Sequence, residues 1–415
     1  MPKTMAIDTG DTAWLLVATA LVLMMNIPGL SLFYAGMVRK KNVLATAVQA
    51  FAVAALVTVL WFAVGYSLAF TDGGAVMEVI GGLSRAFGAG LHGATHALAK
   101  TVPENVFLMY QATFAIITPA IIAGAFAERM KFSAMMWFMG IWLLVIYVPV
   151  THWVWGGGFL GRAGVLDFAG GLVVHLNAGL AGLVCALVLG KRHGYGHEYM
   201  APHNLVLTLI GTSLLWVGWF GFNAGSALAS GELAGFAMLN THVSAATAAL
   251  TWMAIEWASR GKPSVLGVLS GAVAGLGTVT PAAGYVEPWA AMAIGLAAGA
   301  VCYWMSVVVK TRLGYDDTLD VFGVHGVGGI LGSLLVGVFA TSAINDVRNG
   351  QPVGLVDGRG EQILIQLYGV AVIGLYTAVG TWIILKIVDF MVGLRVTRDE
   401  ETEGLDTVLH GERVQ

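Results

Sequence analysis

Charged residues are scarce in this sequence. Asp, Glu, Lys and Arg make up 11% of its 415 residues, whereas a soluble domain carries about 25%. Apolar residues make up 57% of the chain, and the mean hydropathy is +0.79. A soluble protein with so few charges could not cover its own surface, so the sequence predicts an integral membrane protein.

Cysteine is nearly absent, and positive charge is not in excess. Cys185 and Cys302 are the two cysteines and both lie in apolar runs, which excludes a disulfide framework and a cysteine zinc site. The net charge of −3 gives no sign of nucleic-acid binding. Glycine, in contrast, accounts for 56 residues, nearly twice the usual share of about 7%. Because small residues allow membrane helices to approach closely, this composition favours a helix bundle over a β-barrel.

Long apolar runs are the main feature that the sequence does contain. A spanning helix needs about 20 mostly apolar residues. The first run continues past residue 30, which is too long for the core of a cleavable signal peptide. We therefore expect an all-α membrane protein with eleven spans, at residues 12–36, 43–70, 105–127, 133–150, 168–190, 205–229, 233–258, 264–281, 288–309, 321–341 and 363–390.

The Lys and Arg residues between these spans orient the chain, because cytosolic loops carry an excess of them. With the N-terminus outside, the cytosolic segments hold 15 Lys and Arg residues and the outer segments hold 6. We therefore expect the N-terminus outside and the C-terminus inside. Residues 1–392 would form the membrane domain. Residues 393–415 would form a cytosolic tail that packs on the cytosolic face, meets a partner, or is simply a solvated end.

Two helix starts share one pattern. "DFAGGLVVH" begins at Asp167 and "DTLDVFGVH" begins at Asp317, and each Asp is followed by a His eight residues later, His175 and His325. They fall in the fifth and tenth spans, which run in opposite directions, so we expect an inverted repeat of about 1–195 and 204–345. Eight residues of helix cover about 12 Å. Starting from opposite faces, the two rings would therefore meet near the middle of the membrane.

A buried His has two readings. A single one is more often a packing residue, and we assign His242 in the seventh span to that class. An ionisable residue within the membrane usually marks an ion or proton path. For His175 and His325, in matching positions of a repeat, we favour the functional reading, with one ring nitrogen donating to the other.

Eight stretches of the sequence carry a resemblance to one known family: "IPGLSLFYAGMVRKKNVL" (27–44), "AERMKFSA" (127–134), "HWVWGGG" (152–158), "DFAGGLVVH" (167–175), "GWFGFNAGSA" (218–227), "KPSVLG" (262–267), "DVFGVHGVGG" (320–329) and "EGLDTVLHGE" (403–412). The resemblance covers nearly the whole chain. It is to the ammonium transporters of the Amt/Mep/Rh superfamily, on the bacterial and archaeal Amt side. It implies a homotrimer in the cytoplasmic membrane, one pore in each subunit, and regulation from the cytosol by a PII-type (GlnK-like) protein.

The resemblance also implies roles for single residues. Trp155, Phe114 and Ser226 resemble an outer recruitment site for ammonium, and Tyr110 lies beside it, where many relatives carry Phe. Aromatic faces attract a cation by about 1 kcal/mol when exposed and about 2 kcal/mol or more when desolvated. A Ser oxygen can accept a hydrogen bond from ammonium, which potassium cannot donate.

The pore residues follow from the same resemblance. Phe114 and Phe222 resemble a stacked pair that closes the outer vestibule. His175 and His325 resemble the twin-His pair of the pore. Asp167 resembles an Asp behind the recruitment site; we expect it to cap a helix and to bias the field toward cations without contacting the substrate.

We therefore expect ammonium to bind outside and lose its proton, and neutral ammonia to pass the His pair. The proton would also cross through the two imidazoles, which makes transport electrogenic. The alternatives are an electroneutral ammonia channel and an ammonium sensor that signals through a PII-type partner. We do not expect an enzyme, a metal or a cofactor, because no paired carboxylate, metal-ligand cluster or activated nucleophile is evident.

Overall fold

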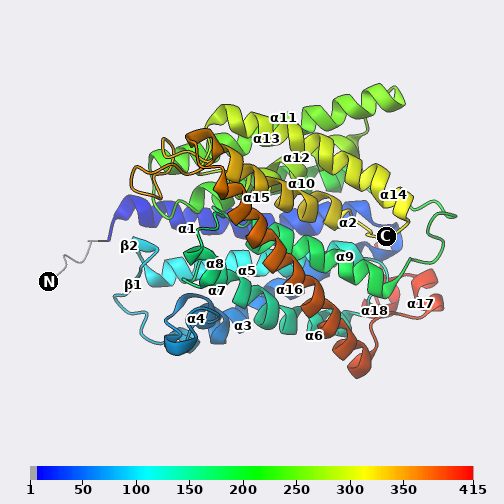
Figure 1. Ribbon diagram of the computed structural model, residues 1–415. Coiled ribbons are helices and arrows are strands. Elements are labelled where there is room, and N and C mark those ends of the chain that lie inside the picture. The colour runs from blue at the N-terminus through cyan, green and yellow to red at the C-terminus, as the bar shows by residue number, and fades with distance from the viewer. Residues whose placement is uncertain (1–6, 415) are drawn as a thin grey trace.

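The computed structural model describes residues 7–414, and nearly all of its regular structure is helical (Figure 1). The two short strands β1 (Thr95–His96) and β2 (Ala99–Pro103) form an antiparallel hairpin at the end of the bundle where α1 begins. Within the described residues, ten helices are long and apolar enough to cross a membrane: Thr9–Met37, Lys40–Phe70, Glu104–Phe126, Phe132–Arg162, Gly171–Leu189, Leu205–Gly225, Glu232–Arg260, Pro288–Leu313, Phe322–Phe339 and Glu361–Val392.

These helices agree with ten of the eleven expected runs to within a few residues at most ends. The remaining run, 264–281, corresponds to α12 (Val265–Val279), an apolar helix of 15 residues. At about 1.5 Å per residue, α12 is about 22 Å long, shorter than the hydrocarbon core of a bilayer. It is one of the most deeply packed helices, since it lies between α11 (Glu232–Arg260), α13 (Pro288–Tyr303) and α15 (Val327–Phe339).

Several spans contain a π-helical turn that the sequence pattern does not show. Pro28 lies in the first such turn, and its missing N–H interrupts the ladder of helical hydrogen bonds.

The π-helical turns are labelled η and divide several spans into shorter α-helices. In chain order, the α-helices and π-helical turns of the spans not yet given are α1 (Thr9–Met24), η1 (Met25–Leu30), α2 (Ser31–Met37), α3 (Val43–Leu60), η3 (Trp61–Gly65), α4 (Tyr66–Phe70), α5 (Glu104–Phe126), α6 (Phe132–Trp142), η6 (Leu143–Tyr147), α7 (Val148–Val154), α8 (Phe159–Arg162), η7 (Gly171–Leu176), α9 (Asn177–Leu189), α10 (Leu205–Gly225), η8 (Trp304–Val309), α14 (Lys310–Leu313), η9 (Phe322–Gly326) and α16 (Glu361–Val392).

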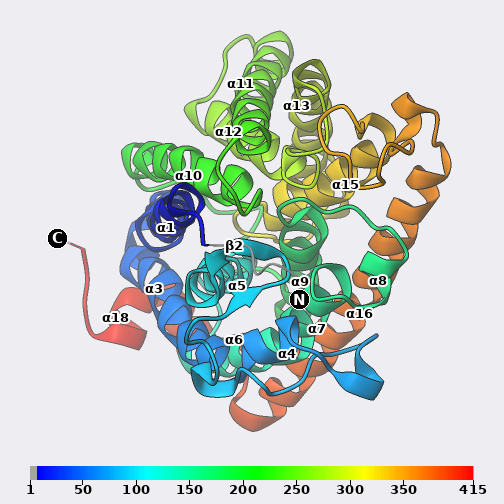
Figure 2. The ribbon, with the colours of Figure 1, turned by 90° about the vertical axis from the view of Figure 1, so that its left-hand side faces the viewer.

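Seen along the bundle axis, the helices surround a central region, and α16 lies on the outside (Figure 2). It packs mainly against α6, α9 and α15. The tail forms two short helices, α17 (Arg398–Glu403) and α18 (Leu405–His410), at the end of the bundle opposite the start of α1 (Figure 1). The Asp406 carboxylate accepts hydrogen bonds from the backbone N–H groups of Leu44 and Ala45 at the start of α3. The tail is therefore packed on the membrane domain.

The helices that carry His175 and His325 touch backbone to backbone. A Cβ atom added to Gly179 of α9 would lie 2.1 Å from the Cα of Gly326. A Cβ added to Gly329 of α15 would lie 2.6 Å from the carbonyl oxygen of Gly171. The glycines after each His therefore allow the two helices to cross with no side chain between them.

This crossing gives a first prediction. We expect Gly179→Ala to destabilise the protein by about 1–3 kcal/mol, because the added methyl group meets backbone that cannot move aside. The matched control is Gly235→Ala in the first turn of α11, where an added Cβ meets nothing within 4 Å. The control should be neutral or slightly stabilising, since Ala is a better helix former than Gly. Thermal unfolding of the purified variants measures both effects; equal unfolding temperatures would contradict the crossing.

Candidate functional site

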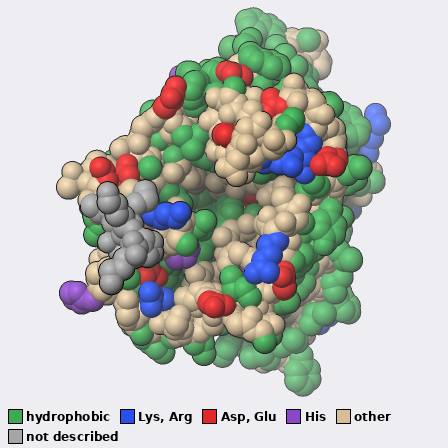
Figure 3. Space-filling view, turned by 60° about the vertical axis from the view of Figure 1, so that its left-hand side comes forward, with side chains coloured by type: hydrophobic (Ala, Val, Ile, Leu, Met, Phe, Trp, Pro, Cys, Tyr) green, Lys and Arg blue, Asp and Glu red, His purple; other side chains and the backbone are tan. Residues whose placement is uncertain are grey.

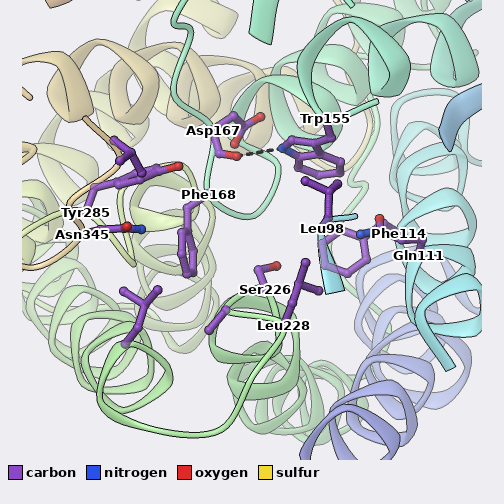
Figure 4. Close-up of a pocket in the computed structure, with 13 residues that line it drawn as sticks. Leu98, Gln111, Phe114, Trp155, Asp167, Phe168, Ser226, Leu228, Tyr285 and Asn345 are labelled. Atoms are coloured by element: carbon purple, nitrogen blue, oxygen red, sulfur yellow. Dashed lines mark hydrogen bonds between the residues drawn. The ribbon is translucent and has the colours of Figure 1, made fainter. Parts of the chain in front are cut away.

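A vestibule opens on the end of the molecule where α1 begins. The face turned forward in Figure 3 is hollowed at its centre, with charged side chains around the rim. The cavity measures about 380 Å³, and its lining combines aromatic with polar side chains (Figure 4). It is lined by Leu98, Gln111, Phe114, Trp155, Asp167, Phe168, Ser226, Ala227, Leu228, Leu233, Tyr285, Asn345 and Val347.

Two aromatic rings form one wall of this vestibule. Trp155 directly follows α7 as its C-cap residue, and its indole Nε1 donates to the carbonyl oxygen of Asp167 at 2.8 Å, which fixes the orientation of the ring (Figure 4). The ring of Phe114 lies edge-on to it, with 6.0 Å between centroids. Such a pair offers a cation the negative face of an aromatic ring in a partly dehydrated place.

Ser226 supplies an oxygen atom to the same vestibule. Its Oγ donates to the carbonyl oxygen of Phe222 at 2.9 Å, in the last turn of α10. The Tyr110 hydroxyl lies 2.9 Å and 3.0 Å from the carbonyl oxygens of Phe222 and Gly221, and 3.2 Å from Ser226 Oγ. The phenol has one proton, which it donates to these carbonyl oxygens and not to Ser226. A lone pair of Ser226 Oγ therefore remains available to a donor in the vestibule.

Tyr110 itself does not line the vestibule. Its side chain is fully buried, and its hydroxyl points at the end of α10. The structure thus brings Trp155, Phe114 and Ser226 together around one cavity and places Tyr110 behind Ser226, as a support for the hydroxyl and for the C-terminal turn of α10.

Gln111 lines the vestibule although the sequence did not single it out. It precedes Phe114 by one turn of α5, and Figure 4 shows its amide beside that ring. Its side chain is 7% exposed, and its Oε1 has no hydrogen-bond partner among the described residues. A polar residue at position i−3 from an expected site residue is the signal that would have found it, because positions three apart share a helix face.

Below the vestibule the passage is closed by two stacked rings. Phe114 and Phe222 lie 4.2 Å apart between centroids, inclined by 25°, and both are buried. The ring of Phe222 is 6.1 Å from that of His175. Phe114 therefore belongs both to the vestibule wall and to the closure, and Phe222 separates the vestibule from the histidines.

The two histidines meet inside the bundle. Their Nδ1 atoms lie 3.2 Å apart, and the rings are nearly parallel, with 5.3 Å between centroids. The exposed fractions are 0% for His175 and 5% for His325. At this distance one Nδ1 donates to the other, so the neutral pair holds a single proton between its two Nδ1 atoms. Both rings lie in π-helical turns, η7 and η9, a form of helix that is frequent at functional sites.

A small apolar cavity continues from the His pair. Its volume, about 10 Å³, is close to the space that one water-sized molecule needs. Apart from His325, its lining consists of apolar and aromatic side chains: Met25, Leu30, Phe33, Ile117, Ile121, Leu215, Trp219 and Val273. A charged solute would have no polar partner here except the His325 ring.

Asp167 satisfies both of its carboxylate oxygens with backbone N–H groups. It accepts from Gly170, Gly171, Leu172 and Val173 at 2.7–3.0 Å. Burial raises the pKa of this carboxyl group, and the four donors oppose the rise by stabilising the carboxylate. The side chain therefore caps η7, while its carbonyl oxygen holds the indole of Trp155.

Asp317 is less well satisfied. One oxygen accepts from the backbone N–H of Phe322 at 2.7 Å, and the other has no partner among the described residues. Burial raises the pKa of Asp317 to about 6. Asp320 forms an ion pair with Lys310. Asp317 thus caps the start of η9, and Asp320 forms an ion pair near the same helix start.

The assignment of His242 needs a correction. We expected a buried packing residue, but its side chain is exposed on the outer surface of α11, where its Nδ1 accepts a hydrogen bond from Trp216 at 3.2 Å. Helical periodicity explains this, because its neighbours Asn240 and Thr241 take the inward positions.

Known proteins resemble this chain over nearly its whole length. The profile of the Ammonium Transporter Family matches residues 13–415. The ammonium transporter of Aquifex aeolicus is 49% identical over 411 residues, which cover 98% of this chain and 93% of that protein.

Solved structures show the same fold. The crystal structure of Saccharomyces cerevisiae Mep2 superposes with a TM-score of 0.88 at 36% identity and covers 95% of this chain and 89% of that one. A structure described as a sensor Amt protein has the same TM-score at 28% identity, with 97% and 98% covered. Since the family profile and a close relative both span nearly the whole sequence, the chain belongs to the Ammonium Transporter Family.

Proposed function

We propose that this protein carries ammonium across the cytoplasmic membrane through a pore of its own in each subunit of a homotrimer. The observation that supports this most strongly is continuity. One ring, Phe114, lines the cation-binding vestibule and stacks on Phe222, which in turn lies beside the buried His pair. A site for a cation is thus joined to a narrow apolar passage with two proton-carrying groups.

Each step follows from the side chains along this path. Ammonium binds against Trp155 and Phe114 and donates a hydrogen bond to Ser226, which replaces part of its water. The passage beyond Phe222 offers a bare cation almost no polar partner, and a charge in such a place is costly. Ammonium therefore leaves its proton and passes as ammonia.

The proton crosses through the two imidazoles. When His175 receives a proton on Nε2, it passes the proton on Nδ1 to His325 Nδ1, and His325 releases its own Nε2 proton. His175 Nε2 has no hydrogen-bond partner among the described residues, so it is free to receive one. Both rings must then return to their first tautomers. This sequence moves one positive charge per ammonia and makes transport electrogenic.

The arrangement in the membrane completes the proposal. α12 crosses as the eighth of eleven spans, with the N-terminus outside, the C-terminal tail (393–415) inside, and 1–195 and 204–345 as inverted repeats. An odd number of crossings agrees with the tail lying at the opposite end of the bundle from the start of α1. A PII-type protein would approach the cytosolic end, next to the tail.

Two alternatives remain distinct. An electroneutral channel would conduct ammonia and leave the proton outside. A sensor would bind ammonium and signal through a partner, as the similarity to a sensor Amt protein allows. Uptake of ammonium and charge movement, measured in the same proteoliposomes, separate all three.

We expect ammonium pulses to produce inward currents in proteoliposomes that hold the wild-type protein. His175→Ala and His325→Ala should each abolish the current, because either change removes one half of the proton path. Uptake without charge movement in the wild type would support the electroneutral channel. Binding without uptake would support the sensor.

The outer site gives a matched pair of variants. Ser226→Ala should raise KM for ammonium about ten- to a hundred-fold, since a hydrogen bond to a charged group contributes about 1.5–3 kcal/mol. It should also reduce the preference for ammonium over potassium. Tyr110→Phe should lower the thermal stability but change KM much less, because the hydroxyl bonds to the carbonyls of α10. A larger effect on KM from Tyr110→Phe than from Ser226→Ala would contradict this division of roles.

A further inference from the structure

The ring of His152 has an unusual pair of partners. It is completely buried, its Nδ1 lies 2.9 Å from the carbonyl oxygen of Ala69, and its Nε2 lies 2.7 Å from the carbonyl oxygen of Met77. Carbonyl oxygens only accept hydrogen bonds. A neutral imidazole has one N–H group and one bare nitrogen, so it could satisfy one carbonyl and would turn a lone pair toward the other. Only the doubly protonated ring donates to both.

His96 provides an internal comparison in the same part of the molecule. Its Nε2 lies 3.0 Å from the carbonyl oxygen of Phe70, whereas its Nδ1 accepts from the backbone N–H of Leu98 at 3.2 Å. One acceptor and one donor match the neutral ring. Burial also lowers the pKa of His96, which favours the same state.

The position of the Ala69 carbonyl favours a cation. Ala69 lies in the last turn of α4, at the end of a continuous helical segment that runs from Lys40 to Phe70. The last carbonyls of a helix have no partner within it, and they form the negative end of the helix dipole. A positively charged donor is stabilised there, which reduces the cost of burying it.

His152 belongs to a turn that is tied to the outer loop 71–82. Three consecutive carbonyl oxygens of that loop, those of Met77, Glu78 and Val79, accept from the His152 ring, the Phe159 N–H and the Trp153 indole. The turn between them holds Trp155, the wall of the vestibule. The His152 ring therefore contacts both this loop and the end of α4.

The glycines of "HWVWGGG" make room for this link. A Cβ atom on Gly156 would lie 2.0 Å from the Ala69 carbonyl oxygen and 2.7 Å from His152 Nδ1. The carbonyl oxygen of His152 accepts from the N–H groups of Gly156 and Gly158, both at 3.0 Å. His152 thus stabilises the turn through both its ring and its backbone carbonyl group.

We propose that the His152 ring carries a proton on both nitrogens, donates to the end of α4 and to the outer loop 71–82, and so positions Trp155 in the vestibule. It is a positioning residue, since it does not line the cavity. The double protonation of the His152 ring is argued from its hydrogen-bond geometry alone. The effect of His152 on ammonium binding through Trp155 rests on the proposed function.

No other ionisable side chain hydrogen-bonds to this ring among residues 7–414. Glu78 pairs with Arg162, and both are more than half exposed. The ionisable groups on the elements packed around α7 are Tyr66 of α4, Asp72 and Glu78 of the outer loop, Tyr147 of η6, Arg162 of α8, Asp167 before η7, His175 of η7 and Tyr376 of α16. The two carbonyl groups therefore decide the state of the His152 ring.

The test is the ¹⁵N spectrum of the full-length protein labelled at histidine and reconstituted in lipid near neutral pH. His152→Gln and His96→Gln identify the two signals by subtraction. We expect two N–H nitrogens for His152, and one N–H and one bare nitrogen for His96. A bare nitrogen on His152 in the folded protein would overturn the proposal.

Transport assays separate this inference from the proposed function. We expect His152→Gln to raise KM for ammonium several-fold at neutral pH, with a smaller effect on kcat, because Trp155 is no longer held. An unchanged KM would overturn the positioning role while the proposed function stood. A wild-type protein that does not take up ammonium would overturn the proposed function and leave the spectrum to decide the charge of His152.

Discussion

The crossing of two helix backbones is the constraint on which the interior of this protein depends. Gly179 and Gly326 face each other with no room for a methyl group, and Gly329 meets the backbone of η7 in the same way. Only this approach brings the Nδ1 atoms of His175 and His325 to 3.2 Å. At a larger separation the rings would be two isolated buried bases, each lacking a partner. At this separation they share one proton, and the cost of burying them falls.

The sequence predicts this part of the structure well, and the reasons are physical. Long apolar runs have few alternatives to spanning helices, so ten of the eleven runs match helices that are long enough to span. The matching Asp–His spacing predicts that the rings meet. The π-helical turns were not predictable, because a shift from one hydrogen-bond register to another depends on packing between helices that are distant in the chain. Among the π-helical turns of the described residues, η1, which contains Pro28, and η6, which is followed by Pro149, carry a local sign.

The outer site was predictable in part. Trp155, Phe114 and Ser226 came from the resemblance to a family, and the structure gathers them around one cavity. The position of Tyr110 behind Ser226 was not accessible from sequence, because the direction of a hydroxyl depends on which carbonyls lie in reach. Gln111 shares the helix face of Phe114, yet a lone Gln in an apolar helix is not distinguishable from a packing residue without the cavity. His242 was assigned wrongly for a related reason. It lies beside the buried residues Asn240 and Thr241, although its own side chain points outward.

The two Asp–His units are alike in spacing but differ in how their carboxylates are held, so the two ends of the passage differ in their electrostatics. Asp167 receives four backbone N–H groups, which support a fixed negative charge beside the vestibule. Asp317 receives one, and its other oxygen has no partner within residues 7–414. A symmetric pair of anions would attract cations equally from both sides. With one carboxylate stabilised and the other only half satisfied, the field favours a cation at the vestibule, where the aromatic rings and Ser226 can hold it. The two helices with matching Asp–His spacing thus set the geometry of the His pair, and the differences at their ends make the vestibule side the more favourable side for a cation.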